Sequence, residues 1–498
     1  MIQDSKFSPG RRIFKAAAIA AVFFVSGFFV SHCFAQTQKK SDAERAEESM
    51  EYLRTIYQVF NSLQQRYVEE IDPKILYEGA LKGMMDSIGD PYTVYLDVTE
   101  MRGLNDTTSG NFYGVGLSIS KSNVSTPEKP AYVDVISPIE NTPGFKAGIQ
   151  AGDKIIEING EPTPEMSMET VLSKLRGPKG EGVEVTVLRG KTVTFKRTLI
   201  RDLIEVPTVE YGMIDEIGYA RLIQFTPETV DRFQDALDIF AKSGYKGLII
   251  DLRNNPGGLL DSAARIADKF IDEGPLVSTK GRYASETRTI EAHKAATKVE
   301  KGVPVVILIN RGSASASEIL AGALKDNHLA YLVGQRTYGK GSVQQVFGLR
   351  ENDGVKMTVA RYYTPSDTNI DKIGIPPDME IALSPEYTDE QTKAFIKLSE
   401  DGVIRKYVDE HSDLTESQIA AYAVELQKSY DLDLRFLRRL VRVEVSRTKG
   451  SVLYDLDYDV QLNAAIDIIR GGKFKTLVKE TKTLKELQQE VESKSKDK

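Results

Sequence analysis

The sequence predicts an α/β protein with three further parts: helices near the N-terminus, a small strand-rich domain before the α/β core, and an all-helical region after it. Strands and helices alternate between residues 217 and 380, strand-like runs dominate residues 112–200, and charged helical patterns follow Pro385. Alternation of this kind is typical of a core with much parallel sheet. With 498 residues, the chain is too long for one ordinary core, so we expect roughly two to four domains.

The composition excludes several classes of function. Hydrophobic residues make up 41% and charged residues 28%, as in ordinary soluble globular proteins, and a net charge of −7 gives no reason to expect a nucleic-acid partner. Cys33 is the single cysteine, so no intrachain disulfide can form. The four histidines lack the spacing of metal ligands, and we therefore do not expect metal catalysis.

Residues 1–36 have the pattern of an export signal. Arg11, Arg12 and Lys15 precede an uncharged stretch from Ala16 to Ala35, and its strongly apolar part is short for a membrane span. Small residues near Ala35 fit cleavage after that position, and an uncleaved membrane anchor stays open as the alternative. Either interpretation places the rest of the chain outside the cytoplasm, in the periplasm or another extracytoplasmic space.

The next segment, residues 42–110, is predicted to be helical. Apolar residues from Met50 to Tyr67 recur mostly at steps of three and four, which is typical of an amphipathic helix, and a second helix is expected from Pro73 to Met85. These helices either complete a core or pair with another copy of the chain. A homo-oligomer is therefore among the expectations.

Residues 111–200 contain five strand-like runs and one helix candidate, Met168 to Leu175. This order of elements resembles a PDZ domain, with Gly114-Val115-Gly116-Leu117 at the start of the first strand and glycine-rich stretches between residues 144 and 160. A loop of consecutive backbone N–H groups can capture a terminal carboxylate while the bound peptide adds a strand to the sheet edge. We therefore expect Gly114, Val115, Gly116 and Leu117 to bind peptide.

A candidate nucleophile lies where a buried strand meets a helix. The apolar run from Val303 to Ile309 leads into Gly312-Ser313-Ala314-Ser315-Ala316-Ser317-Glu318, which opens a helical pattern. Unpaired N–H groups in the first helical turn would stabilise an oxyanion beside Ser315. A serine hydroxyl needs a base, and the glycine-flanked Lys340 can serve if burial lowers its pKa.

A glycine-rich turn is expected near the same site. The strand that ends at Leu252 continues into Arg253-Asn254-Asn255-Pro256-Gly257-Gly258, and ligands gather at the carboxyl ends of strands in such sheets. Gly257 or Gly258 could supply one N–H of an oxyanion hole, with the N–H of Ala316 as the other. A simple turn after a buried strand is the competing interpretation.

Three stretches together resemble the C-terminal processing (tail-specific) serine peptidases: Asp251 to Gly258, Gly312 to Glu318, and Gly339-Lys340-Gly341-Ser342-Val343-Gln344. The resemblance covers about residues 45–385. It implies a crotonase- or Clp-like peptidase core over residues 201–385, with Ser315 as nucleophile, Lys340 as general base and Gln344 positioning that lysine. It also implies protein substrates with exposed apolar C-termini, an adaptor or activator protein as a further partner, and no cofactor.

Competing interpretations remain open for several residues. Ser313 and Ser317 could be helix caps, with Ser317 the better candidate if the helix begins at Glu318. His328 could be the base of a serine triad, although it lies beyond the far end of the same helix. Arg176 either reports occupancy of the PDZ domain to the peptidase core or is a salt-bridged surface arginine. The whole chain could also be a catalytically silent PDZ scaffold or a ligand-binding protein.

Residues 386–498 form a series of charged helical patterns in which we find no catalytic chemistry. The patterns cover residues 388–410, 415–430, 433–447, 457–470 and 474–495. A module for oligomerisation or partner binding and a plain structural appendage are both compatible with them.

Overall fold

The computed structural model describes residues 42–496 except 123–124, 127–129, 140–141, 151, 191, 351, 383–386, 412 and 450–452. It separates into two units, Met1–Met84 and Met85–Lys498. The predicted export signal, residues 1–36, lies outside the described residues. Within the described part of the chain, no helix is both long and apolar enough to cross a membrane.

The described residues of the first unit form two helices, as the apolar spacing predicts. Helix α2 (Asp42–Arg66) is 25 residues long, and α3 (Pro73–Asp86) follows it. Large apolar side chains of α2, among them Leu53 and Ile56, are exposed.

The second unit is built on a six-stranded sheet with the strand order β10-β11-β12-β15-β16-β19. Strands β10 and β11 pair antiparallel, and all later neighbours pair parallel. Its strands are β10 (Val209–Ile214), β11 (Ile217–Leu222), β12 (Gly247–Asp251), β15 (Val305–Ile309), β16 (Tyr331–Gly334) and β19 (Met379–Glu380). Because β12, β15 and β16 run parallel, the loops that follow them leave the sheet at the same edge.

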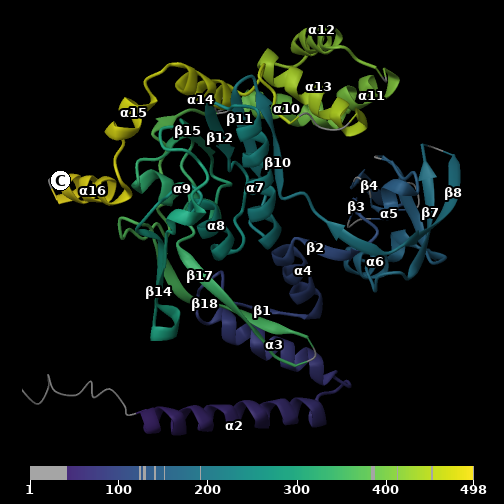
Figure 1. Cartoon of the computed structure of the whole chain (residues 1–498). Helices are drawn as coiled ribbons and strands as arrows, with labels where there is room; N and C mark the ends of the chain where they lie inside the picture. Colours follow the sequence, from purple (N-terminus) through teal and green to yellow (C-terminus); the bar gives the residue numbers. More distant parts are fainter. Residues whose placement is uncertain are drawn as a thin grey trace, which may run out of the picture. The chain divides into compact units, whose positions relative to one another are not determined.

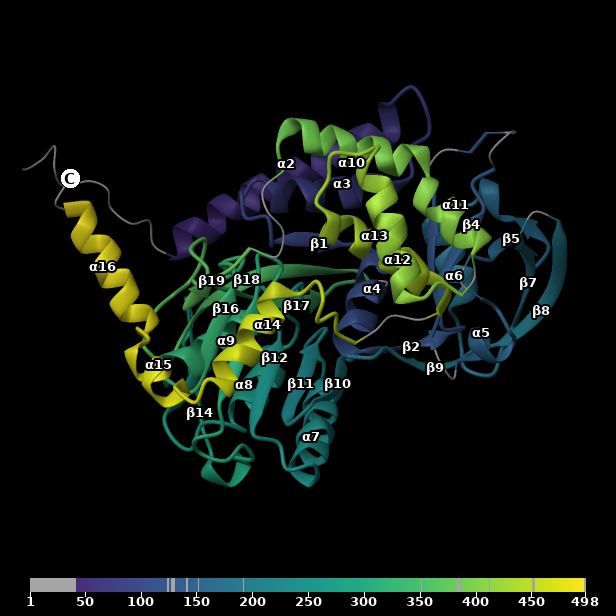
Figure 2. The ribbon, with the colours of Figure 1, turned by 90° about the horizontal axis from the view of Figure 1, so that it is seen from above.

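Helices cover both faces of this sheet (Figure 2). Successive side chains of a strand point to opposite faces, so Leu248 and Ile250 pack on α7 (Pro227–Lys242), α8 (Leu260–Ala267) and α9 (Ala316–Asp326). Ile249 packs instead on α14 (Val460–Arg470) and α15 (Phe474–Glu480). A Cβ atom at Gly247 would lie 2.4 Å from Ile469, so glycine permits the close approach of α14 to β12.

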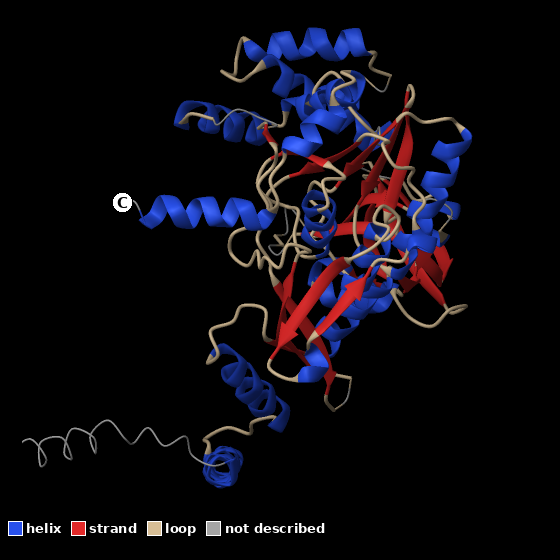
Figure 3. Cartoon of the chain, turned by 60° about the vertical axis from the view of Figure 1, so that its left-hand side comes forward, coloured by secondary structure: helices blue, strands red, loops and turns tan. Residues whose placement is uncertain are grey.

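A second, antiparallel sheet follows the order β1-β18-β13-β14, with β17 also paired to β18. Figure 1 shows β17 and β18 as a long hairpin, and in Figure 3 they stand out as long red arrows. Its strands are β1 (Val94–Leu96), β13 (Pro275–Gly281), β14 (Arg288–Glu291), β17 (Ser342–Gly348) and β18 (Gly354–Tyr363). β17 begins two residues after Lys340, and β1 brings a segment from before the PDZ domain to β18.

The strand-rich domain predicted for residues 111–200 extends in the structure to β9, which ends at Glu205. Its main sheet has the order β3-β4-β5-β7-β8, with the short β6 on β5, and β2 pairs separately with β9. The elements are β2 (Asn111–Gly114), β3 (Leu117–Lys121), β4 (Val133–Pro138), α5 (Pro143–Lys146), β5 (Lys154–Ile158), β6 (Glu161–Pro162), α6 (Met168–Leu175), β7 (Gly182–Arg189), β8 (Val193–Ile200) and β9 (Asp202–Glu205). Helix α4 (Val98–Ser109) connects β1 to this domain. This domain has an apolar core of its own, which includes Val133, Ile155 and Val185.

The C-terminal helices pack in two groups. The first group is α10 (Asp389–Asp401), α11 (Val403–Glu410), α12 (Glu416–Gln427) and α13 (Leu434–Lys449), and it has its own apolar cluster. In the second group, α14, α15 and α16 (Leu484–Lys496) contribute side chains to the two apolar clusters on the faces of the six-stranded sheet. The expected helix over 388–410 breaks at Gly402, which has a φ of 61°, and the one over 474–495 breaks at residues 481–483.

Candidate active site

The candidate nucleophile lies in a strained turn between β15 and α9. Ser315 is the N-cap residue of α9 and has φ 55° and ψ −113°, a conformation that non-glycine residues rarely adopt. Its carbonyl accepts hydrogen bonds from the N–H groups of Glu318 and Ile319 at 2.8 and 3.0 Å and from the Tyr362 hydroxyl at 3.3 Å. These bonds hold the strained residue in place beside the N–H group of Ala316, which is the N–H of the first helical turn that has no hydrogen-bond partner among the described residues.

Glu318 joins two loops. The serine loop carries Ser315 between β15 and α9, and the lysine loop carries Lys340 between β16 and β17. One carboxylate oxygen, Oε2, accepts from the N–H of Ser315 at 2.8 Å and from the N–H of Lys340 at 2.9 Å. The other, Oε1, accepts from the N–H of Gly339 at 2.7 Å and from the Thr337 hydroxyl at 2.6 Å. Burial raises the pKa of Glu318 above its usual value, while these four donors favour the carboxylate. A single buried side chain thus brings the two sequence motifs together.

The side chain of Lys340 lies in a partly buried environment. Its Nζ is 5.1 Å from the centre of the Tyr92 ring. Burial lowers the pKa of Lys340, the nearby cation of Lys356 lowers it further, and the carboxylates of Glu318 and Asp90 act in the opposite direction. The net lowering favours the neutral amine, which is the form that can accept a proton.

The backbone N–H groups expected to form an oxyanion hole differ in their hydrogen bonds. The N–H of Gly257 donates to Asn255 Oδ1 at 2.9 Å, whereas those of Gly258 and Ala316 have no hydrogen-bond partner in the described part of the chain. A Cβ atom at Gly257 would lie 2.8 Å from Ser315 Cβ and 3.0 Å from Ala316 N, so the close approach requires glycine. Of the two expected glycines, Gly258 is the one that offers an N–H group.

Gln344 lies on β17 and contacts hydroxyl groups. Its Nε2 donates to Ser342 Oγ at 3.0 Å and to Thr358 Oγ1 at 3.2 Å. Among the described residues, no hydrogen bond joins Gln344 to Lys340, and none joins Ser315 Oγ to Lys340 Nζ. Catalytic hydrogen bonds are often long in unliganded enzymes. The role of Gln344 as the residue that positions the lysine therefore stays a prediction.

The alternative serines and the histidine have other partners. Ser317 Oγ donates to a backbone carbonyl of the loop after β12 at 2.9 Å, and Ser313 Oγ donates to another at 2.8 Å. α9 begins at Ala316, so neither serine is its N-cap. His328 follows the end of α9 at Asp326, and its Nδ1 lies 3.0 Å from Thr481 Oγ1. The two serines thus bind the serine loop to the glycine loop, which is the segment of residues 252–258 after β12.

The candidate peptide-binding loop joins β2 to β3. Gly114 ends β2, Leu117 begins β3, and Gly116 between them has a φ of 70°. β3 is the terminal strand of the PDZ sheet, with β4 on one side. This arrangement suits addition of a further strand to β3.

Arg176 follows α6 and contacts α4. Its guanidinium forms an ion pair with Asp106 and lies 4.7 Å from the centre of the Phe112 ring. Both charged side chains are about three-quarters or more buried. Burial raises the pKa of Asp106, and the neighbouring Arg176 and Arg102 lower it in part. The contact connects the PDZ helix to the helix that follows β1.

A cavity of about 700 Å³ lies around the residues that flank Lys340. Its lining includes Tyr92, Tyr338, Gly339, Met357 and Arg361. No group of three or more His, Cys, Asp or Glu side chains in the described ranges could hold a metal ion.

Sequence reasoning missed three residues of the site. Glu318 is three residues after Ser315, and this Ser-x-x-Glu spacing is the capping-box pattern that could have indicated it. Tyr362 and Tyr92 come from β18 and from the segment before β1, far from the motifs in sequence. Nothing in the local pattern points to them.

A strained serine at a helix N-terminus, a lysine of lowered pKa and glycine N–H groups, next to a PDZ domain, are the features of a serine-type peptidase. Residues 216–381 match peptidase family S41, residues 135–189 match the PDZ domain, and residues 17–100 match the N-terminal domain of the activating protease CtpB.

Known proteins agree with this class. The carboxy-terminal-processing protease of Bartonella bacilliformis is 34% identical over 458 residues, which are 90% of this chain and 95% of the relative. The carboxy-terminal processing protease CtpA of Bacillus subtilis is 34% identical over 66% of this chain and 68% of its own. The solved structure of a photosystem II D1 C-terminal processing protease is 31% identical over 66% of this chain and 86% of its own, with a TM-score of 0.40. The chain belongs to the carboxy-terminal processing proteases of peptidase family S41.

The environment of Lys340 predicts an observable titration. We expect the ¹³C-dimethylated amine of Lys340, assigned by its loss in Lys340→Arg, to titrate at lower pH in NMR spectra than the exposed Lys196. Lys356→Met removes a neighbouring cation and should raise the pKa of Lys340, because the ammonium form is then less disfavoured. A Lys340 signal that titrates together with the exposed lysines would contradict this account.

Proposed function

We propose that the protein is an endopeptidase in which Ser315 is the nucleophile and Lys340 the general base. The observation that carries the proposal is the carboxylate of Glu318, which accepts hydrogen bonds from the backbone N–H groups of both residues through one oxygen. Two loops that follow different strands are thereby fixed next to each other. A nucleophile and its base require this proximity.

The reaction proceeds through an acyl-enzyme. Neutral Lys340 accepts the proton of the Ser315 hydroxyl while Oγ attacks the peptide carbonyl, and the N–H groups of Ala316 and Gly258 stabilise the resulting oxyanion. Collapse of this intermediate breaks the C–N bond, and the lysine ammonium protonates the departing amine. Water, deprotonated by Lys340, then hydrolyses the ester. For the first step, Nζ has to leave its position over Tyr92 and approach Ser315 Oγ.

The PDZ domain selects the substrates. An unstructured, apolar protein C-terminus adds to β3 as a further strand, and its carboxylate binds the loop Gly114 to Leu117. The adjoining segment of the substrate then reaches Ser315. An adaptor or activator protein is a further partner, and the match of residues 17–100 to an activating-protease domain supports it.

The protein works outside the cytoplasm and as an oligomer. The basic and apolar pattern of residues 1–36 supports export, and N-terminal sequencing of the protein from an envelope fraction would show whether the segment is removed. The exposed apolar side chains of α2 support pairing with a second copy. Sedimentation of the full chain would contradict this if it gave the mass of one chain.

The dyad can be tested by conservative changes. We expect Ser315→Ala and Lys340→Arg to lower cleavage of a fluorogenic peptide ending in Val-Ala-Ala by roughly 10⁴-fold or more, because arginine keeps the charge and cannot act as a base. His328→Ala should keep the wild-type rate. Wild-type activity should rise with pH towards the lowered pKa of Lys340, because the neutral amine is the active form.

The same experiment separates catalysis from a binding-only scaffold. Cleavage by Ser315→Ala, or an unchanged rate in Lys340→Arg, would overturn the mechanism. If the wild type binds the peptide through its PDZ domain and neither cleaves it nor reacts with a fluorophosphonate probe, with or without peptide present, the scaffold function is correct.

The contacts of Arg176 support a role in reporting PDZ occupancy to the dyad. Its partner Asp106 lies on α4, which follows β1, and β1 follows the segment that carries Asp90 and Tyr92 next to Lys340. A shift of α6 on peptide binding would thus act on the neighbours of the lysine through one continuous segment.

Peptide stimulation tests this role. We expect a non-cleavable C-terminal peptide to raise the labelling rate of wild-type Ser315 by a fluorophosphonate, and Arg176→Ala to lose this response while it still binds the peptide. Lys196→Ala, which removes a surface ion pair with Glu184 in the same domain, is the matched control. An Arg176→Ala protein with unchanged basal and stimulated rates would exclude the role.

A further inference from the structure

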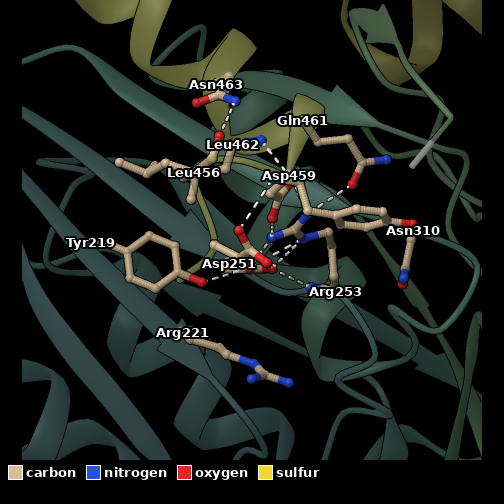
Figure 4. Close-up of polar contacts among 12 residues, drawn as sticks. Tyr219, Arg221, Asp251, Arg253, Asn310, Leu456, Asp459, Gln461, Leu462 and Asn463 are labelled. Atoms are coloured by element: carbon tan, nitrogen blue, oxygen red, sulfur yellow. Dashed lines mark hydrogen bonds and ion pairs between the residues drawn. The ribbon is translucent and has the colours of Figure 1, made fainter. Parts of the chain in front are cut away.

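An arginine at the carboxyl end of β12 is shared between the core and the C-terminal region (Figure 4). The guanidinium of Arg253 donates to Asp251 through Nε at 2.9 Å and through Nη2 at 2.6 Å. It donates to Asp459 through Nη1 at 2.9 Å and Nη2 at 2.6 Å, and to Gln461 Oε1 through Nη1 at 2.9 Å. The Tyr219 hydroxyl donates to Asp251 at 2.8 Å. All five N–H groups of the guanidinium thus face acceptors.

The two C-terminal acceptors are themselves fixed. Asp459 is the N-cap of α14 and accepts from the N–H of Leu462 at 2.9 Å. Gln461 donates to the carbonyl of Ile381 at 2.7 Å. The side chains of Arg253 and Asp459 are only 10% and 13% exposed, so their charges interact in a medium of low dielectric constant. α14 therefore holds Arg253 with a rigid, bidentate contact.

Arg253 is also part of the glycine loop. Asn254 comes next with a φ of 59° and exchanges hydrogen bonds with Asn310 before the nucleophile loop. The carbonyl of Asn255 accepts from the N–H of Ala314 at 3.1 Å and from Ser317 Oγ at 2.9 Å. The loop then reaches Gly258. A displacement of Arg253 would consequently move both the nucleophile turn and the oxyanion N–H group.

We infer that Asp459 and Gln461 are positioning residues for the peptidase reaction: through Arg253 they fix the loop that carries the Gly258 N–H group against Ser315. The inference rests on the proposed function, because it assigns these residues to the same site. It gives the N-terminal end of α14 a role in the rate of acylation. Neither residue touches the substrate, so peptide affinity should be independent of them.

The substitution Asp459→Asn isolates this contact. Asparagine is as good an N-cap as aspartate, so α14 keeps its start, while Arg253 loses a charged partner and one of two oxygens. We expect kcat for the Val-Ala-Ala peptide to fall roughly 10- to 100-fold with KM within twofold, because small displacements of a reacting group have effects of this size. Fluorophosphonate labelling should slow in parallel, and Asp459→Glu should recover part of the rate.

The matched control is Arg470→Gln. Arg470 lies at the other end of α14 and pairs with Asp215 on the surface, so its loss weakens an exposed contact of the same helix without touching Arg253. We expect its kcat to stay within twofold of the wild type. Hydrogen exchange of residues 252–262 should be faster in Asp459→Asn than in the wild type or the control.

The outcomes distinguish three cases: Asp459 positions the loop, α14 only packs on the sheet, or the proposed function fails. An equal fall of kcat in both variants, or an unchanged kcat and unchanged exchange in Asp459→Asn, overturns the inference. If the wild type neither cleaves nor is labelled, the proposed function fails. In that case, hydrogen exchange of residues 252–262 decides alone. Faster exchange in Asp459→Asn would show that Asp459 fixes the loop, and equal exchange would contradict this.

Discussion

The site depends on one buried carboxylate. Glu318 accepts four hydrogen bonds, from the loop before α9 and from the loop before β17, and no other described side chain bonds the backbone of both Ser315 and Lys340. A buried carboxylate is costly unless all of its hydrogen bonds are made. The loss of any one of the four donors would therefore destabilise the folded site. The positive φ of Ser315 is sustained by this set of bonds. The geometry of the candidate nucleophile, Ser315, and the position of the candidate base, Lys340, thus share one physical cause.

The sheet places these loops side by side. Because β12, β15 and β16 are parallel neighbours, the glycine loop, the serine loop and the lysine loop all start at the same edge of the sheet. A sheet of this kind needs apolar cover on both faces. Helices α7, α8 and α9 supply one layer and α14 and α15 the other, so the C-terminal region contributes to the core as well as forming the separate α10–α13 cluster.

Local patterns predicted β11, β12, β15 to β18, the five strands of the main PDZ sheet, most helices and the two motifs, because periodicity and glycine spacing are local properties. They did not predict β10, β13 or β14. The same sequence carried the Ser-x-x-Glu spacing of Ser315 and Glu318, although only the fold shows that this carboxylate also reaches Lys340. The contacts of Tyr92 and Asp459 were not predictable, since they depend on pairing between segments far apart in the chain. Gly402 breaks a helix whose apolar spacing continues through it, because its left-handed conformation ends the backbone pattern. Whether Gln344 orients the lysine stays a prediction.

The place of α14 in the chain bears on when the peptidase can form. Ile249, Val306 and Leu308 lie at the centre of the sheet, and their apolar cover comes from residues 460–478, which follow the last strand. During synthesis, this face stays open to water until residues 460–478 have been made. The Arg253–Asp459 contact forms at the same late stage. A chain that ends before α14 therefore lacks a completed core, which delays formation of the peptidase until α14 and α15 have been made.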